Sequence, residues 1–224
     1  MFDSELAFGD CFMRSVTPSV WSRSHAGSII LSAFESDCSD GRADWIWASS
    51  SGPWPVSWTE RTAEALQNPT SSRILAYLKL SSPRSERFLR EKVGVSESTF
   101  DRSIRELVKL QLIELTNDKC FLLSPNAELP DVEICAFEFK LENWRRAFYQ
   151  ASRYRSFAHR VYVVLPESTA GRAKSHLDAF RLQNIGLISF SSENGAHRVQ
   201  SSNKRKPRSR SNFIQAIGML HQSR

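Results

Sequence analysis

The chain has 224 residues, of which 41% are hydrophobic, so it can bury a substantial core. No apolar run approaches the length of a membrane span, and the start of the chain lacks the basic and apolar segments of a secretory signal. The four cysteines form no CxxC or Cys/His cluster, which argues against structural zinc; these features together predict a cytoplasmic protein with reduced thiols.

The net charge of +6 is concentrated near the C-terminus. Residues 197–224 contain seven Lys or Arg and no acid, so the rest of the chain carries −1. Such a segment suits contact with phosphate backbones, and we expect Lys204, Arg205 and Lys206 to contribute to it. A solvated segment without a ligand is the alternative, and the two are compatible.

Residues 1–58 form the first part of the chain. We predict an amphipathic helix over Phe2–Met13, strands over Ser28–Phe34 and Ala43–Ala48, and a linker over Ser49–Trp58, which contains two prolines. A helix and a hairpin cannot close a core alone. We therefore expect these strands to complete a sheet formed by later residues.

Residues 59–125 form the second part and have a helical pattern followed by a hairpin. Capping residues and apolar periodicity predict helices over Ser71–Leu78, Ser85–Val93 and Glu97–Leu110. Two short apolar runs, Leu112–Leu115 and Cys120–Leu123, flank a polar turn.

This order resembles a winged helix-turn-helix domain, both in the Gly94-Val95-Ser96 turn and in the phrase over residues 107–113. The resemblance implies DNA binding through the N-terminal part of the third helix. Its outward residues and the hairpin tip supply the candidate DNA contacts, which are Ser98, Thr99, Arg102, Arg105 and Lys119. A protein-docking module or a spacer is the alternative.

The third part, residues 126–200, alternates strands with helices. The expected elements are strands over Val132–Leu141, Arg160–Pro166 and Ile185–Phe190 and helices over Glu142–Arg155 and Ala173–Arg181. This alternation predicts an α/β sheet with a parallel crossover pair. Ser191–Ser211 is expected to be loop, and the basic tail over residues 201–224 to contain a terminal helix over Phe213–His221.

One apolar strand carries a carboxylate and a lysine two positions apart, Glu138 and Lys140. Strand residues i and i+2 point to the same face, so these two project together while Phe137 and Phe139 point the other way. Two charges buried in an apolar strand are costly unless they are paired or bind a ligand. A metal ion and a phosphate would be such ligands.

Three motifs in chain order resemble the PD-(D/E)XK nuclease superfamily, closest to its RecB-like branch. They are GxxD at Gly41–Asp44, ExK at Glu138–Lys140, and QxxxY at Gln150 and Tyr154. The resemblance implies a restriction-endonuclease-like mixed sheet flanked by helices, with the winged helix inserted between the two motif halves. It also implies a Mg²⁺ or Mn²⁺ cofactor.

The chemistry of phosphodiester hydrolysis explains these residue types. A divalent metal neutralises phosphate oxygens and acidifies a water, and Asp44 and Glu138 are candidate ligands for it. Lys140 would position the attacking water and offset charge. The resemblance adds the backbone carbonyl of Phe139 as a ligand and Glu5 as an outer one. Gln150 and Tyr154 share a helical face and could contact phosphate or orient the lysine.

Ordinary structural roles stand beside these assignments. Glu138 and Lys140 would form a surface ion pair if their strand were an edge, Asp44 could be a turn residue, Gln150 and Tyr154 could lie on a helix surface, and Glu5 could be a helix-start carboxylate. Asp131 follows a proline and competes with Asp44. It lies only seven residues before Glu138, with no room for a hairpin between them, so Asp44 is preferred.

These patterns lead to one main hypothesis. It is a magnesium-dependent deoxyribonuclease whose winged helix holds DNA, with a homodimer or a partner protein as further interactions. The alternative is a non-catalytic DNA-binding regulator, or a subunit of a larger complex, that uses a nuclease-like scaffold.

Overall fold

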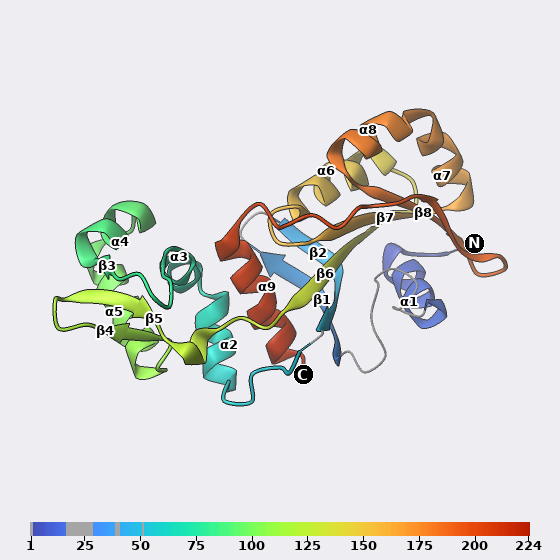
Figure 1. The fold of residues 1–224 in the computed structure, drawn as a ribbon. Coiled ribbons are helices and arrows are strands. Elements are labelled where there is room, and N and C mark those ends of the chain that lie inside the picture. Colours follow the sequence, from blue (N-terminus) through green and yellow to red (C-terminus); the bar gives the residue numbers. More distant parts are fainter. Residues whose placement is uncertain (1, 17–28, 39–40, 51) are drawn as a thin grey trace. The chain divides into compact units, whose positions relative to one another are not determined.

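The computed structural model describes residues 2–16, 29–38, 41–50 and 52–224. The chain forms two compact units, each made from two separate segments. The sheet unit comprises residues 1–51 and 132–208, and the helical unit comprises residues 52–131 and 209–224 (Figure 1). None of the helices in these described ranges is both long and apolar enough to cross a bilayer.

The sheet unit is built on a six-stranded mixed sheet with strand order β1-β2-β6-β7-β8-β9. The β6–β7 and β7–β8 pairs are parallel and the other pairs are antiparallel, which confirms the expected mixed sheet and parallel crossover. The strands are β1 (Ile29–Cys38), β2 (Gly41–Ser50), β6 (Val132–Phe139), β7 (Arg160–Pro166), β8 (Gly186–Ser191) and β9 (Gly195–Gln200). The N-terminal hairpin therefore completes the sheet of the third part, as predicted.

Helices cover both faces of this sheet (Figure 1). One face carries α1, and the other carries α6, α7 and α8 with the short 3₁₀ turn η3. Their bounds are α1 (Glu5–Ser15), α6 (Trp144–Tyr154), α7 (Glu167–Ala173), η3 (Lys174–His176) and α8 (Leu177–Gln183). The region expected as one helix over Ala173–Arg181 is thus α7, η3 and α8.

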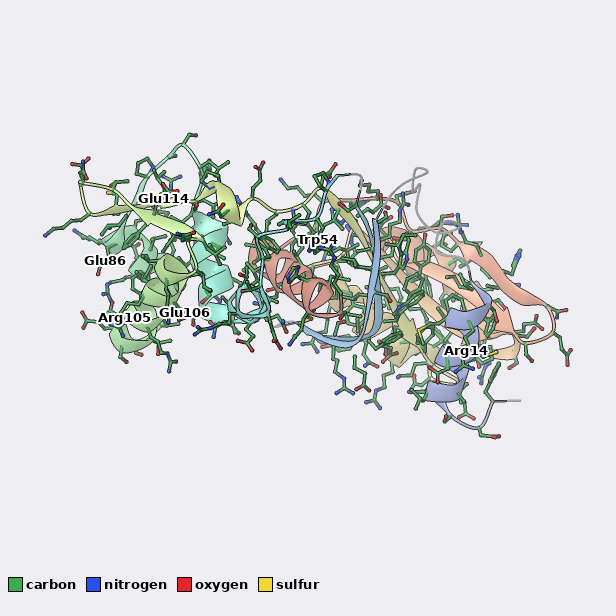
Figure 2. The ribbon with its side chains drawn as sticks, turned by 90° about the horizontal axis from the view of Figure 1, so that it is seen from below. Arg14, Trp54, Glu86, Arg105, Glu106 and Glu114 are labelled. Carbon is green, nitrogen blue, oxygen red and sulfur yellow. The ribbon has the colours of Figure 1, made fainter. Side chains whose placement is uncertain are left out.

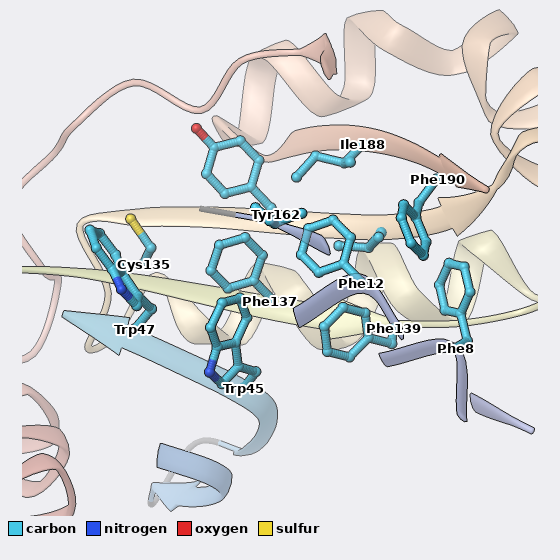
Figure 3. Close-up of a cluster of buried hydrophobic side chains, with 12 residues drawn as sticks. Phe8, Phe12, Trp45, Trp47, Cys135, Phe137, Phe139, Tyr162, Ile188 and Phe190 are labelled. Carbon is cyan, nitrogen blue, oxygen red and sulfur yellow. The ribbon is translucent and has the colours of Figure 1, made fainter. Parts of the chain in front are cut away.

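Aromatic side chains fill the space between α1 and the sheet (Figure 3). Phe8 and Phe12 of α1 pack on alternate residues of the strands, among them Trp45 of β2 and Phe137 and Phe139 of β6. Because alternate strand residues point to opposite faces, this core fixes which residues of β2 and β6 face α6.

The segment after β8 differs from the sequence prediction. Residues 195–200 form the edge strand β9 instead of loop, with His197 and Arg198 exposed on it. The residues after β9 contact β6, because Lys204 pairs with Glu133 at 3.1 Å. Glu133 also accepts from Arg160 of β7 at 2.5 Å. Burial alone would raise the pKa of Glu133, but these two cations outweigh it and lower the pKa.

The helical unit contains five helices, a 3₁₀ turn and a small sheet of order β3-β5-β4 among its described residues. Its elements are α2 (Glu60–Gln67), α3 (Pro69–Tyr77), β3 (Arg84–Ser85), α4 (Glu86–Val93), α5 (Glu97–Lys109), β4 (Ile113–Leu115), β5 (Cys120–Leu123), η2 (Pro125–Ala127) and α9 (Arg210–Gln222). The C-terminal helix α9 packs on α2 and α3, and its Ile214, Ile217 and Leu220 are buried. The end of the basic tail is therefore part of a folded core.

Candidate active site

Strands β2 and β6 bring Asp44 and Glu138 together. Their antiparallel ladder ends with Trp45 paired to Phe137, so Asp44 and Glu138 are the next residues at that end of the two strands. The backbone N–H of Phe139 donates to Asp44 Oδ2 at 2.8 Å. Strand β2 begins at Gly41, which has a φ of +150°. This conformation favours glycine, which accounts for the first residue of the GxxD motif.

Glu138 is a fully buried carboxylate in a central strand. Its Oε2 contacts the hydroxyl of Tyr154, whereas its Oε1 has no hydrogen-bond partner and lies 3.3 Å from Lys140 Nζ. Burial, reinforced by the nearby charge of Asp44, raises the pKa of Glu138 to about 7. Burial also raises the pKa of Asp44. Glu138 and Lys140 therefore do not form the surface ion pair expected of an edge strand.

Tyr154 of α6 links Glu138 to the backbone of β2. Its hydroxyl lies 2.6 Å from the carbonyl oxygen of Arg42 and also contacts Glu138 Oε2. A phenol has only one hydrogen to donate. Both contacts can be hydrogen bonds if the Tyr154 hydroxyl donates to the Arg42 carbonyl and accepts from a protonated Glu138. The raised pKa of Glu138 favours this arrangement. Burial, followed by the Glu138 charge, raises the pKa of Tyr154.

The ammonium of Lys140 lies among three oxygen atoms. Its Nζ is 2.8 Å from Glu5 Oε2, 3.2 Å from the carbonyl oxygen of Phe139 and 3.3 Å from Glu138 Oε1. Burial alone would lower the pKa of Lys140, but the Glu5 hydrogen bond and the charge of Glu138 outweigh it and raise the pKa. These three oxygens belong to residues proposed as metal ligands, so together they form a site suited to a cation.

A pocket of about 690 Å³ opens beside these groups. Its polar lining includes Glu5, Asp44, Lys140 and Gln150. Gln150 projects from α6, and its side-chain oxygen is buried without a hydrogen-bond partner. An unpaired buried amide oxygen is costly unless a ligand or water satisfies it.

The donor set fits a hard divalent cation. Within the described ranges no group of three or more His, Cys, Asp or Glu side chains could hold a metal by itself. Asp44 accepts from the backbone N–H of Phe139, however, and Lys140 Nζ lies near both the Phe139 carbonyl and Glu138 Oε1. Two oxygens, Glu138 Oε1 and Gln150 Oε1, are buried without hydrogen-bond partners. Mg²⁺ accepts one or two carboxylates and keeps several waters, so this all-oxygen set suits Mg²⁺ or Mn²⁺.

The structure places the candidate nucleic-acid residues in both units. On α5, Ser98, Arg102 and Arg105 are exposed, and Figure 2 shows Arg105 next to Glu106 on this unit. Thr99 is half-buried, and its Oγ1 accepts from Ser96 Oγ at 2.8 Å. Lys119 is exposed at the turn between β4 and β5, with a φ of +54°.

The basic residues Lys204, Arg205 and Lys206 of the sheet unit already make some contacts within that unit. Lys204 pairs with Glu133, whereas Arg205 and Lys206 expose their side chains. The backbone N–H of Arg205 donates to the carbonyl of His159 at 3.1 Å, which fixes the position of this segment.

Sequence reasoning missed the apolar and charged residues that complete the pocket. They are Leu6, Gly9, Asp10 and Met13 of α1, Phe34 and Glu35 of β1, and Arg42 of β2. No spacing signal could have identified them, because their proximity depends on how α1 and β1 pack beside β2. Asp131, the rival of Asp44, is exposed and precedes β6.

Comparison with known proteins finds no matching family model, no matching curated protein and no matching solved structure.

Proposed function

We propose that this protein is a metal-dependent nuclease of the PD-(D/E)XK type that hydrolyses phosphodiester bonds in DNA. The observation that carries the proposal is the convergence of Asp44, Glu138 and Lys140 at one end of the β2–β6 pair, beside a pocket. Asp44 lies 94 residues before Glu138 in the sequence, and the pairing of β2 with β6 brings the two motifs to the same end of the sheet. Perturbed carboxylates beside a lysine in a pocket are a general mark of functional sites.

Each residue of the site has a role in this proposal. Asp44, Glu138 and the Phe139 carbonyl would hold Mg²⁺ or Mn²⁺, which when bound neutralises phosphate oxygens and acidifies a water. Lys140 carries a proton at Nζ and offsets the negative charge that develops on the attacked phosphate. Gln150 accepts from the attacking water or donates to a phosphate oxygen. Tyr154 fixes the orientation of Glu138 and is a positioning residue.

The helical unit supplies the DNA-binding part of the proposal. Helices α3, α4 and α5, followed by the β4–β5 hairpin, have the order of a winged helix-turn-helix. The exposed start of α5 would enter the major groove, with Arg102 and Arg105 at phosphates or base edges and Lys119 at the backbone. In the sheet unit, Arg205 and Lys206 would add phosphate contacts.

Cleavage of labelled DNA in Mg²⁺ or Mn²⁺ tests the catalytic assignment. We expect Lys140→Ala to lower the cleavage rate by about 100-fold or more, because it removes a preorganised charge from the site. Lys174→Ala is the matched control, since Lys174 is an exposed lysine of the sheet unit outside the pocket. Melting temperatures establish that both variants are folded. A Lys140→Ala enzyme that cleaves at the wild-type rate contradicts the assignment.

The same assay separates the alternative function. A protein that binds DNA with strong salt dependence but cleaves none, with either metal, is the regulator or complex subunit and not the nuclease.

A further inference from the structure

Two exposed apolar side chains share the pocket with the candidate catalytic residues. Phe34 of β1 is 58% exposed and Leu6 of α1 is 74% exposed. Both side chains line the same pocket as Asp44 and Lys140. Single exposed apolar residues are ordinary on protein surfaces. Two of them in a pocket with a few convergent polar groups are a feature of ligand sites.

Phe34 lies near the end of the sheet that carries Asp44. It pairs across the β1–β2 ladder with Trp45, the residue after Asp44, so its side chain is on the α1 face with Trp45, and the pocket extends from Phe34 to Asp44. The next residue, Glu35, has a φ of +46°, which is uncommon for a non-glycine residue, and its carboxylate pairs with Arg42 at 3.0 Å. Residues in such conformations persist where their surroundings enforce them, and they concentrate at functional sites.

The charges of the pocket do not favour a polyanion by themselves. Its lining contains four carboxylates, of Glu5, Asp10, Glu35 and Asp44, and two cationic side chains, of Arg42 and Lys140. A nucleic acid bound here needs a divalent cation for its phosphate and an uncharged contact for the rest of the nucleotide. Phe34 and Leu6 provide the uncharged surface.

We propose that the pocket takes a nucleotide whose base is unpaired and stacks on Phe34, with Leu6 packing against the base. This inference rests on the proposed nuclease function and names its substrate class, which is single-stranded DNA or the frayed end of a duplex. Bases inside an intact duplex are stacked on one another, so an aromatic side chain can reach a base face only when that base has left the stack.

Fluorescence of 2-aminopurine tests the stacking contact. The probe is a phosphorothioate-protected single-stranded oligonucleotide containing 2-aminopurine, titrated with the full chain in Mg²⁺. We expect binding to quench the fluorescence, and Phe34→Ala to remove the quenching and weaken binding by about 5- to 100-fold, the usual range for one base–aromatic stack. Phe34→Trp should retain both. The matched control is Tyr149→Ala, which removes an exposed aromatic ring of the same unit outside the pocket.

The outcomes separate this inference from the nuclease proposal. Unchanged quenching and affinity in Phe34→Ala, or equal affinity of the wild type for a blunt duplex, overturns the unpaired-base contact even if metal-dependent cleavage is observed. Such a result would leave Phe34 and Leu6 to another occupant, such as a protein segment. Conversely, the wild-type protein could quench the fluorescence, lose this quenching in Phe34→Ala, and yet cleave no DNA. That result supports the base contact and contradicts the nuclease proposal.

Discussion

Glu138 shows how a costly residue is stabilised. A buried carboxylate is unfavourable unless neighbours neutralise it or bond to it. Here one oxygen contacts the Tyr154 hydroxyl, the other lies near the Lys140 ammonium, and the raised pKa of Glu138 reduces its charge near neutral pH. The protein thus retains a group that an apolar residue could replace with less cost, as expected for a functional site.

Tyr154→Phe tests the positioning role of the phenol. Removing the hydroxyl leaves the Arg42 carbonyl without its donor and Glu138 Oε2 without its hydrogen-bond partner, which should lower the free energy of unfolding by about 1–3 kcal/mol. Because groups that orient ligands strongly affect metal sites, we expect Mg²⁺ affinity, measured by calorimetry, to fall by about 10- to 100-fold. Tyr149→Phe, at an exposed tyrosine of the same helix, should change neither value. An unaltered Mg²⁺ affinity in folded Tyr154→Phe would remove Tyr154 from the site.

Some of the site could be predicted from local rules. The two-residue period of a strand places Glu138 and Lys140 on one face, and the structure confirms this by packing Phe137 and Phe139 on the opposite face. Glu5 was predicted as an outer metal ligand from a resemblance and not from spacing, and the structure pairs it with Lys140. Phe34 was predicted as a strand residue but not as part of the pocket, because its place there depends on packing between distant segments.

At the level of elements, α9 depends on a glycine for its close approach to α2. A Cβ atom at Gly218 would lie 2.9 Å from the carbonyl oxygen of Ala63 and 2.9 Å from Leu66 Cβ. Both distances are shorter than real Cβ contacts, so any larger residue must push the two helices apart.

Gly218→Ala should therefore destabilise the helical unit. Alanine gains about 1 kcal/mol in helix propensity, but overpacking at a backbone contact costs about 1–3 kcal/mol, so we expect a net loss. The matched variant is Gly171→Ala in α7, where an added Cβ meets nothing within 4 Å. It should be neutral or slightly stabilising. Chemical denaturation of the two variants measures the difference, and an equally stable Gly218→Ala protein would contradict the packing argument.

Sequence patterns predicted most elements but failed where burial is one-sided or weak. The strand β7 was predicted with its observed bounds because a continuous apolar run ends at Pro166. The edge strand β9 was expected to be loop, since its exposed face carries polar residues such as His197 and Arg198. The helix α2 was not delimited, because its buried residues are mostly small, such as Ala63 and Ala65.

At the scale of the whole molecule, each unit is assembled from two separated segments of chain. The helical unit contains residues 52–131, but part of its core comes from α9, which follows the entire sheet unit in sequence. Gln215 of α9 donates to Ser72 Oγ at 2.8 Å, which adds a buried hydrogen bond to the apolar contacts. Residues 52–131 alone therefore lack part of their own interior.

Deletion of residues 209–224 should selectively destabilise the helical unit. It removes three fully buried side chains, Ile214, Ile217 and Leu220, which contribute at least about 5 kcal/mol together. We expect hydrogen exchange to show lost protection in α2 and α3 while β6 and β7 stay protected. Deleting only the last two residues, which are exposed, is the control. Retained protection of α2 in the longer deletion would show that α9 is dispensable.

The insertion also determines when each core can close during synthesis. Strands β2 and β6 are neighbours in the sheet, with Ser50 paired to Val132, so the whole of residues 51–131 must be translated between them. At a translation rate of about 5–20 residues per second, about 4–16 seconds pass between the synthesis of β2 and that of its partner strand β6. Trp45 and Trp47 remain uncovered by β6 during that interval. The nascent chain is therefore most exposed to aggregation, and most dependent on chaperones, while the ribosome is making the helical unit.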